Sequence, residues 1–469
     1  MLLTAVSLRL PRLDDTSVDR ASGTRARGVG HSPVDLAGEG VMDIMFERCA
    51  GIDVHKRTVV VCRLTRDVQG TRVAETQTFG TTTSELLRLS DWLTEGGGTP
   101  VGLESTGEFW KPVFNLLEGA CEVWLLNAQH IKAMPGRKTD VKDAQWIAEL
   151  LAHGLVRPSF IPPQAQRELR DLARYRTSFV RERATLVNRV HKALESANLK
   201  LACVATDIMG VSGRAILAAL LAGETDPTIL AELAKGPLRK KRPQLEQALR
   251  GHLRPHQSFV LTELLAQIDN LEESIVRFTA QIQAMCAQDA DEAEVVALLD
   301  TIPGLSEATA QVVVAEIGTD MTRFPSAAAL AAWAGLAPGN NESAGRQRSG
   351  RTRKGTVWLR TILVQAAQAA AHTKDTALVA RYRRIAARRG HKKAVVALAH
   401  ALLVIIYHVI ARRQPYQEFG ADYFQRRAPA TRAKRLVHQL AHLGFEVQLL
   451  IQQTPAVIGS APTPNELCR

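Results

Sequence analysis

The sequence predicts two fold classes in one chain, a mixed α/β domain followed by a mainly helical remainder. Short β-branched runs bounded by turn residues alternate with helical segments as far as residue 150. Beyond Pro158 and the pair Pro162 and Pro163, these strand signals stop and long helical patterns replace them. Hydrophobic residues make up 46% of the 469 positions, which is enough to form more than one core.

Strand and helix signals divide the chain into segments. The predicted strands read CAGIDVHKRTVVVCRLT, TRVAETQTFGT, TPVGLEST and CEVWLLN, and the helices between them read TSELLRLSDWLTE and GEFWKPVFNLLEG. We expect a disordered extension over residues 1–46, which an upstream start codon would explain, the α/β domain over 47–160, a helical arm over 161–290, a mainly helical domain over 291–415, and a tail over 416–469.

One helix of the predicted arm has a regular apolar seam. Spacings of three and four alternate without a break through Leu261, Leu264, Ile268, Leu271, Ile275, Phe278, Ile282 and Met285. This is the a/d pattern of a coiled coil. The seam packs either on the preceding long helix, which begins near Gln164, or on a second copy of the chain, and the pattern is compatible with both. We expect a homo-oligomer, a dimer or a tetramer.

The first long helix of the arm is rich in arginine. Its arginines are Arg167, Arg170, Arg174, Arg176, Arg181, Arg183 and Arg189. Two interpretations remain open for them. They form a second surface that faces RNA, or they lie on a solvated helix face, because Glu168, Asp171 and Glu182 are interleaved with them.

The strongest charge concentration lies in the last domain. The chain has 59 Lys and Arg against 47 Asp and Glu, a formal charge of +12. Between Ser343 and Lys393 there are fourteen Lys and Arg residues and one acid, Asp375. Such a run repels itself unless phosphates neutralise it, so we expect contact with nucleic acid. Upstream, LLDTIPGLSEATAQVVVAEIG resembles a helix-hairpin-helix, whose glycine turn can hold a phosphate.

Two further patterns limit the class of protein. The apolar stretch 394–411 contains His400 and His408 and is flanked by basic pairs at both ends, so it predicts a buried helix and no membrane span. The six cysteines are scattered, with no CxxC pair, which argues against a disulfide framework and a structural zinc site. A cytoplasmic, nucleoid-associated protein is expected.

Acidic residues occupy special positions in the α/β domain. Asp53 lies within an apolar strand, and Glu104 ends another. Asp140 and Asp143 are three apart at the start of a predicted helix, so they share one face. Together the four carboxylates could hold Mg²⁺ for phosphodiester chemistry. Taken singly, Asp140 and Asp143 also suit the positive end of a helix, and Asp53 could cap a turn.

These motifs resemble those of a known family. GIDVHK, GLESTG and NAQHIKAMPGRKTDVKDAQWIAELLAHGL resemble the RuvC-like DEDD domain of the bridge-RNA-guided insertion-sequence transposases. IPGLSEATAQVVVAEIG, FPSAAALAAWAGLAPGNNESAGRQRSGRTRKG and WLR resemble the second, transposase domain of that family. The similarity extends over residues 47–415. It implies a RuvC/RNase H-like first domain and a transposase domain that carries a catalytic serine.

The resemblance also implies roles for individual residues. Asp53, Glu104, Asp140 and Asp143 become the metal ligands, and Ser343 becomes the nucleophile that joins to a DNA phosphate. The family serine is often followed directly by glycine. Here Ala344 intervenes, and Ser349 is a second candidate. The partners implied are target and donor DNA and a structured guide RNA. The residues that would hold the DNA backbone are Arg346, Arg348, Arg351, Arg353 and Lys354.

Two other functions are compatible with the same residues. One is a RuvC-like metal-dependent nuclease of the resolvase type, in which Ser343 is structural and no covalent intermediate forms. The other is a nucleic-acid-binding protein without catalysis, in which the acids serve as helix caps and ion-pair partners. A covalent protein–DNA adduct separates the transposase from both.

Overall fold

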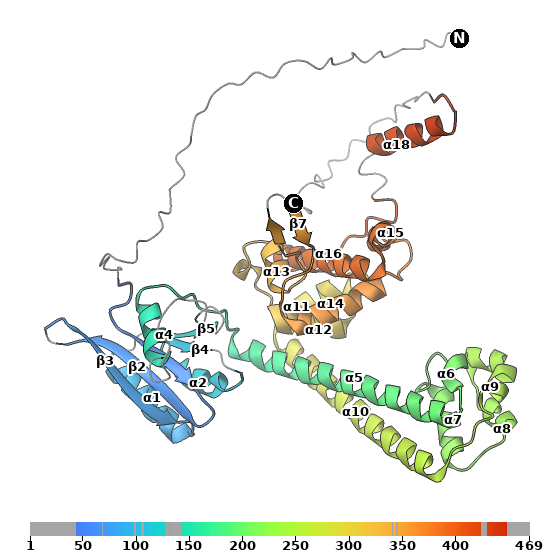
Figure 1. The fold of residues 1–469 in the computed structure, drawn as a ribbon, viewed down its shortest axis with the longest axis horizontal. Coiled ribbons are helices and arrows are strands. Elements are labelled where there is room, and N and C mark those ends of the chain that lie inside the picture. Colours follow the sequence, from blue (N-terminus) through green and yellow to red (C-terminus); the bar gives the residue numbers. More distant parts are fainter. Residues whose placement is uncertain are drawn as a thin grey trace, which may run out of the picture. The chain divides into compact units, whose positions relative to one another are not determined.

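The computed structural model divides into two compact units, Met1–Ile161 and Pro162–Arg469 (Figure 1). The structure describes residues 44–67, 69–97, 100–104, 107–127, 131, 143–339, 341–343, 346–423 and 429–447. The predicted extension over 1–46 therefore lies almost wholly outside the described residues. A mixed α/β unit precedes a mostly helical one, which confirms the predicted fold classes.

The first unit is built on a five-stranded sheet in the order β3-β2-β1-β4-β5. Its strands are β1 Cys49–Val54, β2 Thr58–Arg66, β3 Arg72–Gly80, β4 Val101–Glu104 and β5 Val123–Leu126. The β1-β2-β3 meander is antiparallel, whereas β4 and β5 run parallel to β1. The parallel pairs need crossover connections, and each of the two crossovers contains a helix, whereas a further helix of the unit follows β5.

Helices cover both faces of this sheet. The helices are α1 Thr83–Glu95, α2 Trp110–Leu117 and α4 Asp143–Ala152. Ile52 of β1 and Leu103 of β4 share one core with Leu89 of α1, and α2 contributes to the same core. Cys49 of β1 lies in a separate core with Ile147 of α4. Because successive strand residues face opposite sides, α1 and α2 cover one face and α4 covers the other.

Glycines let α4 lie directly on the sheet. A Cβ atom at Gly51 would lie 2.2 Å from the backbone oxygen of Ala144 and 2.4 Å from the backbone nitrogen of Ala148. On the neighbouring strand, a Cβ atom at Gly102 would lie 3.0 Å from Ile147 Cγ2. A larger residue at position 51 would push the helix away from β1.

The second unit begins with a long antiparallel helix pair (Figure 1). Helix α5, Gln164–Ser196, packs against α10, Pro255–Gln288. The direction follows from two hydrogen bonds, because Arg176 bonds to Thr279 whereas Arg183 bonds to Glu272. All eight seam positions of α10 are buried or half-buried. Of the two pairings that the sequence left open, the structure therefore shows the one within the chain.

Short helices close the far end of this pair. They are α6 Leu201–Val204, α7 Val211–Leu221, α8 Pro227–Glu232, η2 Gly236–Lys241 and α9 Arg242–Ala248. Leu217 of α7, Leu230 of α8 and Leu245 of α9 form one core with Leu194 of α5 and Leu261 of α10.

The rest of the second unit is a helical domain with a small hairpin. Its elements are α11 Ala290–Asp300, α12 Glu307–Ile317, η3 Met321–Arg323, α13 Ala327–Trp333, β6 Asn341–Ser343, β7 Arg346–Ser349, α14 Val357–Ala370, α15 Ala377–Arg389 and α16 His391–Arg412, and α18 Pro429–His442 follows. The turn between α11 and α12 packs on α14, because a Cβ atom at Gly304 would lie 2.6 Å from Ala370 Cβ. The glycine of the predicted helix-hairpin-helix thus serves close packing.

Helix α16 is the centre of this core. It is long and apolar enough to cross a membrane, but Leu398, Leu402 and Ile406 are fully buried among α11, α13 and α14. The prediction of a buried helix is confirmed. Two histidines lie on α16, and burial, together with nearby Arg381, lowers the pKa of His400 below its ordinary value of 6.5. Burial also lowers the pKa of His408 below 6.5, and the nearby Arg412 adds to this effect.

We expect Gly51→Ala to disrupt the packing of α4 on β1. The new methyl group would overlap the backbone of α4, so the free energy of unfolding of the first unit should fall by about 2 kcal/mol or more. Hydrogen exchange of the β1 and α4 amides measures this. The matched control is Gly119→Ala, an exposed position where an added Cβ meets nothing within 4 Å. Equal protection in both variants would contradict the close contact.

Stability of the helical unit should fall as the pH drops from 7.5 to 5.5. The unfolded chain protonates His400 and His408 near pH 6.5, whereas the folded chain resists until lower pH, so acid favours unfolding. Thermal unfolding midpoints measure the slope. The double variant His400→Gln, His408→Gln should flatten it, and His252→Gln, on the exposed surface of the arm, should not. An unchanged slope in the double variant would refute this assignment.

Candidate functional site

Asp53 and Glu104 occupy the same rung of two neighbouring strands. The parallel register pairs Ile52 with Leu103, so the next residues along, Asp53 and Glu104, lie side by side. Ile52 and Leu103 face α1 and α2, and the alternation of a strand turns both carboxylates to the α4 face. Each residue is only 8% exposed. Two carboxylates this close and this buried repel each other unless a cation or donor lies between them.

Helix α4 brings a third acid to the same end of the sheet. Cys49 Sγ donates to the Ala148 carbonyl at 3.4 Å, and Gly51 abuts Ala144, so α4 runs antiparallel to β1. Following β1 onward to Asp53 therefore leads toward the first residue of α4, Asp143, which is half-buried. Burial raises the pKa of Cys49 to about 12, which keeps this thiol protonated as a structural donor.

The fourth predicted acid, Asp140, lies outside the described residues. Among the residues that the structure does describe, no three His, Cys, Asp or Glu side chains are grouped closely enough to hold a metal ion. The structure thus brings Asp53 and Glu104 together and places Asp143 at the same end of the sheet.

His55 is a neighbour of the site that the sequence analysis missed. Its Nε2 lies 3.0 Å from Asp53 Oδ2, and its side chain is 60% exposed. The signal was present in GIDVHK, because positions 53 and 55 share one face of an extended strand. The contact holds one carboxylate oxygen of Asp53 toward the solvent end of β1.

Ser343 lies at the turn of the β6-β7 hairpin. Its backbone pairs with that of Arg346, whereas Ser349 pairs with Asn341, farther from the turn. The turn residues Ala344 and Gly345 lie outside the described residues. Of the predicted DNA-backbone residues, Arg346 and Arg348 belong to β7. The other three, Arg351, Arg353 and Lys354, follow the hairpin and are exposed.

The base of this hairpin is fixed by backbone contacts. Gly339 N–H donates to the Arg351 carbonyl at 2.9 Å, and Pro338 pairs with Thr352. Gly335 has a φ of +68°, and its backbone nitrogen lies 2.3 Å from where a Cβ of Gly355 would be. Both glycines are needed for this approach.

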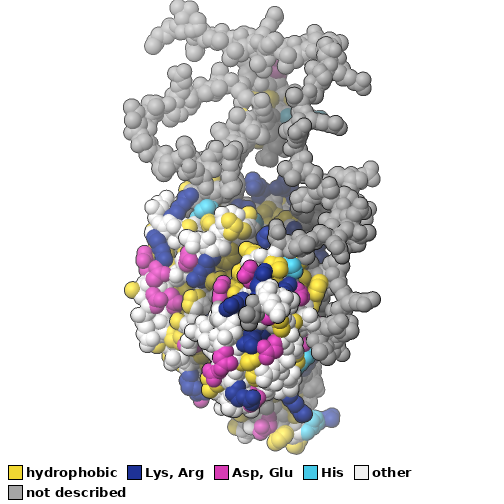
Figure 2. Space-filling view, turned by 90° about the vertical axis from the view of Figure 1, so that its left-hand side faces the viewer, with side chains coloured by type: hydrophobic (Ala, Val, Ile, Leu, Met, Phe, Trp, Pro, Cys, Tyr) yellow, Lys and Arg dark blue, Asp and Glu magenta, His cyan; other side chains and the backbone are white. Residues whose placement is uncertain are grey.

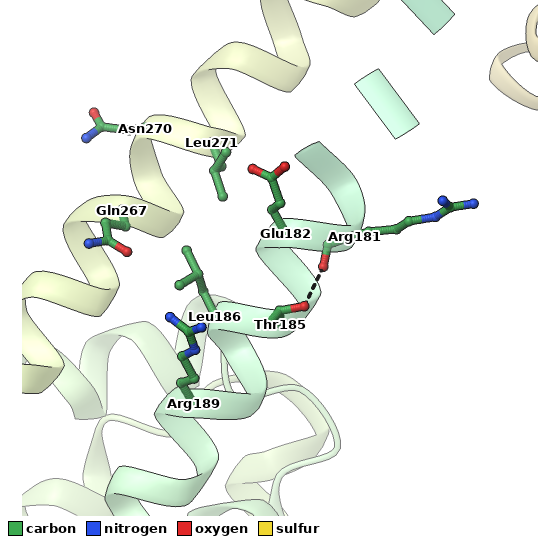
Figure 3. Close-up of a pocket in the computed structure, with 8 residues that line it drawn as sticks. All are labelled: Arg181, Glu182, Thr185, Leu186, Arg189, Gln267, Asn270 and Leu271. Carbon is green, nitrogen blue, oxygen red and sulfur yellow. Dashed lines mark hydrogen bonds between the residues drawn. The ribbon is translucent and has the colours of Figure 1, made fainter. Parts of the chain in front are cut away.

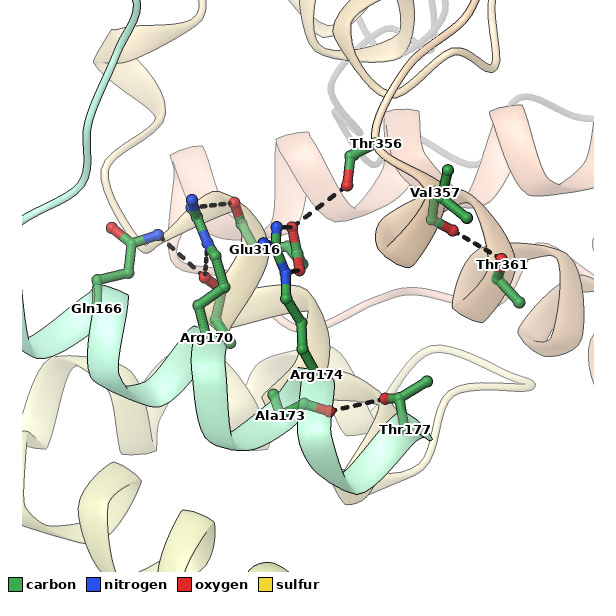
Figure 4. Close-up of polar contacts among 10 residues, drawn as sticks. Gln166, Arg170, Ala173, Arg174, Thr177, Glu316, Thr356, Val357 and Thr361 are labelled. Carbon is green, nitrogen blue, oxygen red and sulfur yellow. Dashed lines mark hydrogen bonds and ion pairs between the residues drawn. The ribbon is translucent and has the colours of Figure 1, made fainter. Parts of the chain in front are cut away.

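A buried ion pair joins α12 to α5 (Figure 4). The Glu316 carboxylate, whose side chain is 1% exposed, accepts from Arg174 Nε at 2.7 Å and from Arg174 Nη2 at 2.9 Å. Thr356, directly before α14, donates to the same carboxylate at 3.4 Å. Arg170 Nη2 donates to the Glu316 carbonyl at 2.8 Å. A bidentate guanidinium is the strongest partner that a buried carboxylate finds in a protein.

Most arginines of α5 are engaged within the chain. Their partners are the Pro162 carbonyl for Arg167, Glu316 for Arg174, Thr279 for Arg176, the Trp358 ring for Arg181 and Glu272 for Arg183. The Arg181 guanidinium lies 4.8 Å from the Trp358 ring centre. These contacts explain most arginines of α5 by packing within the chain, and an RNA-facing surface on α5 stays a prediction.

A cavity of about 520 Å³ lies between α5 and α10 (Figure 3). It is lined by Arg181, Glu182, Thr185, Leu186, Arg189, Gln267, Asn270 and Leu271. Thr185 Oγ1 donates to the Arg181 carbonyl at 3.0 Å. With a single carboxylate and no nucleophile activated by a base, this cavity lacks the groups of an active site.

Comparisons with known proteins find transposases. A family model described as "Transposase" matches residues 50–199, and one described as "Transposase IS116/IS110/IS902 family" matches 296–383. The transposase for insertion sequence element IS1111A of Coxiella burnetii is 27% identical over 298 residues, which is 62% of this chain and 72% of that protein. A probable family 20 transposase of Pseudomonas aeruginosa is 29% identical over 322 residues, 68% of this chain and 85% of that protein.

Arg174→Ala should destabilise the helical unit. It leaves the buried Glu316 carboxylate without its bidentate partner, which costs about 3 kcal/mol of unfolding free energy. Urea unfolding combined with hydrogen exchange of α12 measures the loss. The matched control is Arg277→Ala, whose partner Glu273 is 70% exposed, and it should change stability by less than about 0.5 kcal/mol. If the two substitutions lowered the free energy of unfolding equally, the buried Arg174–Glu316 pair would stabilise the fold no more than an exposed ion pair does.

Proposed function

Because this chain belongs to the IS110 family of insertion-sequence transposases, we propose that it cuts and rejoins DNA with an acidic site in the first unit and a serine in the second. The choice of DNA sites is assigned to a structured RNA encoded by the element. One observation carries the proposal. Asp53 and Glu104 lie side by side, buried, on the face of the sheet that α4 covers.

The first unit supports a RuvC/RNase H-like assignment. Its sheet has an antiparallel meander followed by two parallel strands, with helices on both faces. The acids lie where β1 and β4 end and where α4 begins. Ends of parallel strands are where α/β domains commonly place their active sites.

The donor set fits a divalent cation, for which we propose Mg²⁺. Hard cations prefer carboxylate oxygens, and Asp53 and Glu104 present carboxylates side by side at one end of the sheet. These two residues, with Asp143 and Asp140, would hold it. When bound, the cation would neutralise charge that develops on the phosphate and the leaving oxygen. His55 would keep Asp53 oriented throughout.

Ser343 is proposed as the nucleophile. Its hydroxyl oxygen forms a bond to a DNA phosphorus, the bond from that phosphorus to one deoxyribose oxygen breaks, and the serine proton ends on the departing oxygen. Rejoining reverses the step with a different strand end. The hairpin register supports Ser343 over Ser349, because Ser343 lies next to the turn. The rigid base at Gly335 and Gly355 would hold the hairpin in place.

Further partners follow from the same proposal. Arg346, Arg348, Arg351, Arg353 and Lys354 would contact DNA phosphates around the serine. We also propose that the chain binds a guide RNA. It would act as a dimer or tetramer in the cytoplasm, associated with the nucleoid. The regular α10 seam, which packs on α5, supports a coiled-coil arm.

A resolvase-type nuclease without a covalent intermediate is the alternative. The acids of the first unit favour it as much as they favour the transposase, because they would serve hydrolysis equally well. The hairpin serine is then structural. Only the transposase predicts a bond between protein and DNA.

The test is a covalent adduct. Incubation of the protein with Mg²⁺, the flanking RNA of the element and junction-containing DNA should give a protease-sensitive protein–DNA species on a denaturing gel. Ser343→Ala should abolish the adduct, whereas Ser349→Ala should retain it. Asp53→Ala should abolish both adduct and cleavage. Cleavage without an adduct, equal in wild type and Ser343→Ala, would establish the nuclease instead.

A further inference from the structure

Exposed cations gather where α15 meets α16. Gly390 alone separates the two helices. Six Lys and Arg side chains at this corner are exposed, and they form what is called here the corner surface: Arg383, Arg384, Arg388, Arg389, Lys392 and Lys393.

Most cations of the corner surface lack acidic partners. In the part of the chain that the structure describes, no carboxylate lies within 4.0 Å of Arg383, Arg388, Arg389, Lys392 or Lys393. Among the described residues, Arg388 Nε donates to the Arg384 carbonyl of its own helix. This differs from α5, whose arginines bind Glu316 and Glu272. The face shown in Figure 2 also differs, because Lys and Arg there alternate with Asp and Glu.

Arg388 and Arg389 lie in the last turn of α15, where the helix dipole favours cations, but other features of this arrangement cost folding free energy. Arg384 and Arg388 are four residues apart on α15, and like charges at that spacing destabilise a helix. Lys392 and Lys393 lie in the first turn of α16, where the helix dipole disfavours cations. The buried apolar residues of α16 offset the cost without removing it. A polyanion would neutralise the charges and release its own counterions.

The surface chemistry favours a double helix over a single strand. Proteins that bind single strands stack bases on exposed aromatic rings. No large hydrophobic side chain is exposed between Lys374 and Lys393. The phenol ring there, Tyr382, is half-buried, and its hydroxyl bonds to Nδ1 of the neighbouring His391 ring at 2.8 Å, so the two rings are engaged with each other. Cations alone suit the phosphate backbone of a duplex.

We infer that the corner surface binds the phosphate backbone of duplex DNA without reading its sequence. The inference rests on the proposed function, because a transposase supplies the DNA. It adds a second region to the hairpin residues Arg351, Arg353 and Lys354, and it would hold the flanks of the DNA while strands are exchanged.

The experiment measures binding of a random 30-base-pair DNA duplex by fluorescence anisotropy over a series of salt concentrations, in EDTA and without guide RNA. The quadruple variant Arg388→Gln, Arg389→Gln, Lys392→Gln, Lys393→Gln should bind at least about tenfold more weakly. Its plot of log affinity against log salt should be shallower by about 3.6, since each of the four lost phosphate contacts contributes about 0.9. Circular dichroism and thermal unfolding verify that the variant is folded.

A matched variant removes four exposed cations from the arm, with the substitutions Arg239→Gln, Lys240→Gln, Arg250→Gln and Arg277→Gln. It should bind nearly as the wild type does. Equal losses in both variants would overturn the inference in favour of net charge. A loss seen only with an RNA duplex or single-stranded DNA would also overturn it, and would identify that nucleic acid as the partner. Binding in EDTA forms no bond between protein and DNA, so failure of the proposed chemistry leaves this readout unchanged.

Discussion

The close contact between α4 and β1 determines where the acids of the first unit lie. Gly51 has no side chain, so the backbone of α4 rests directly on the strand. That contact sets the helix antiparallel to β1 and brings its first residue, Asp143, to the strand end that carries Asp53. Glu104 lies next to Asp53, on the neighbouring strand β4. A carboxylate site arises here from strand register and one small residue.

Two arginine-rich helices of the second unit, α5 and α15, differ in whether acids lie next to their arginines. On α5, guanidinium groups satisfy Glu316 and Glu272, so their charge stabilises the fold. On α15, Arg383 and Arg389 have no acid in reach among the described residues. Composition alone does not distinguish these helices. What differs is the neighbouring element, since α12 and α10 present acids to α5.

Sequence patterns predicted the elements well because period and composition are local properties. The alternation in GIDVHK and VGLEST indicated strands, and the seam from Leu261 to Met285 indicated a packed helix. The grouping of Asp53 with Glu104 was expected from their positions in two strands, although their shared rung follows from a strand register that the sequence does not show. The pairing of Arg174 with Glu316 joins residues 142 apart and was not predictable. His55 was not predicted as a site residue, because only its contact with the Asp53 carboxylate connects it to the site.

The central claim is that the carboxylates at the ends of β1 and β4 bind a divalent cation. Titration of the full chain with Mn²⁺, followed by electron paramagnetic resonance, tests it without DNA or RNA. The account predicts saturable binding that weakens by about tenfold or more in Asp53→Asn and in Glu104→Gln, since each loses a charged ligand. Glu95→Gln, an exposed change on α1, should bind as the wild type does. Absent binding, or equal binding in all four proteins, would contradict the account.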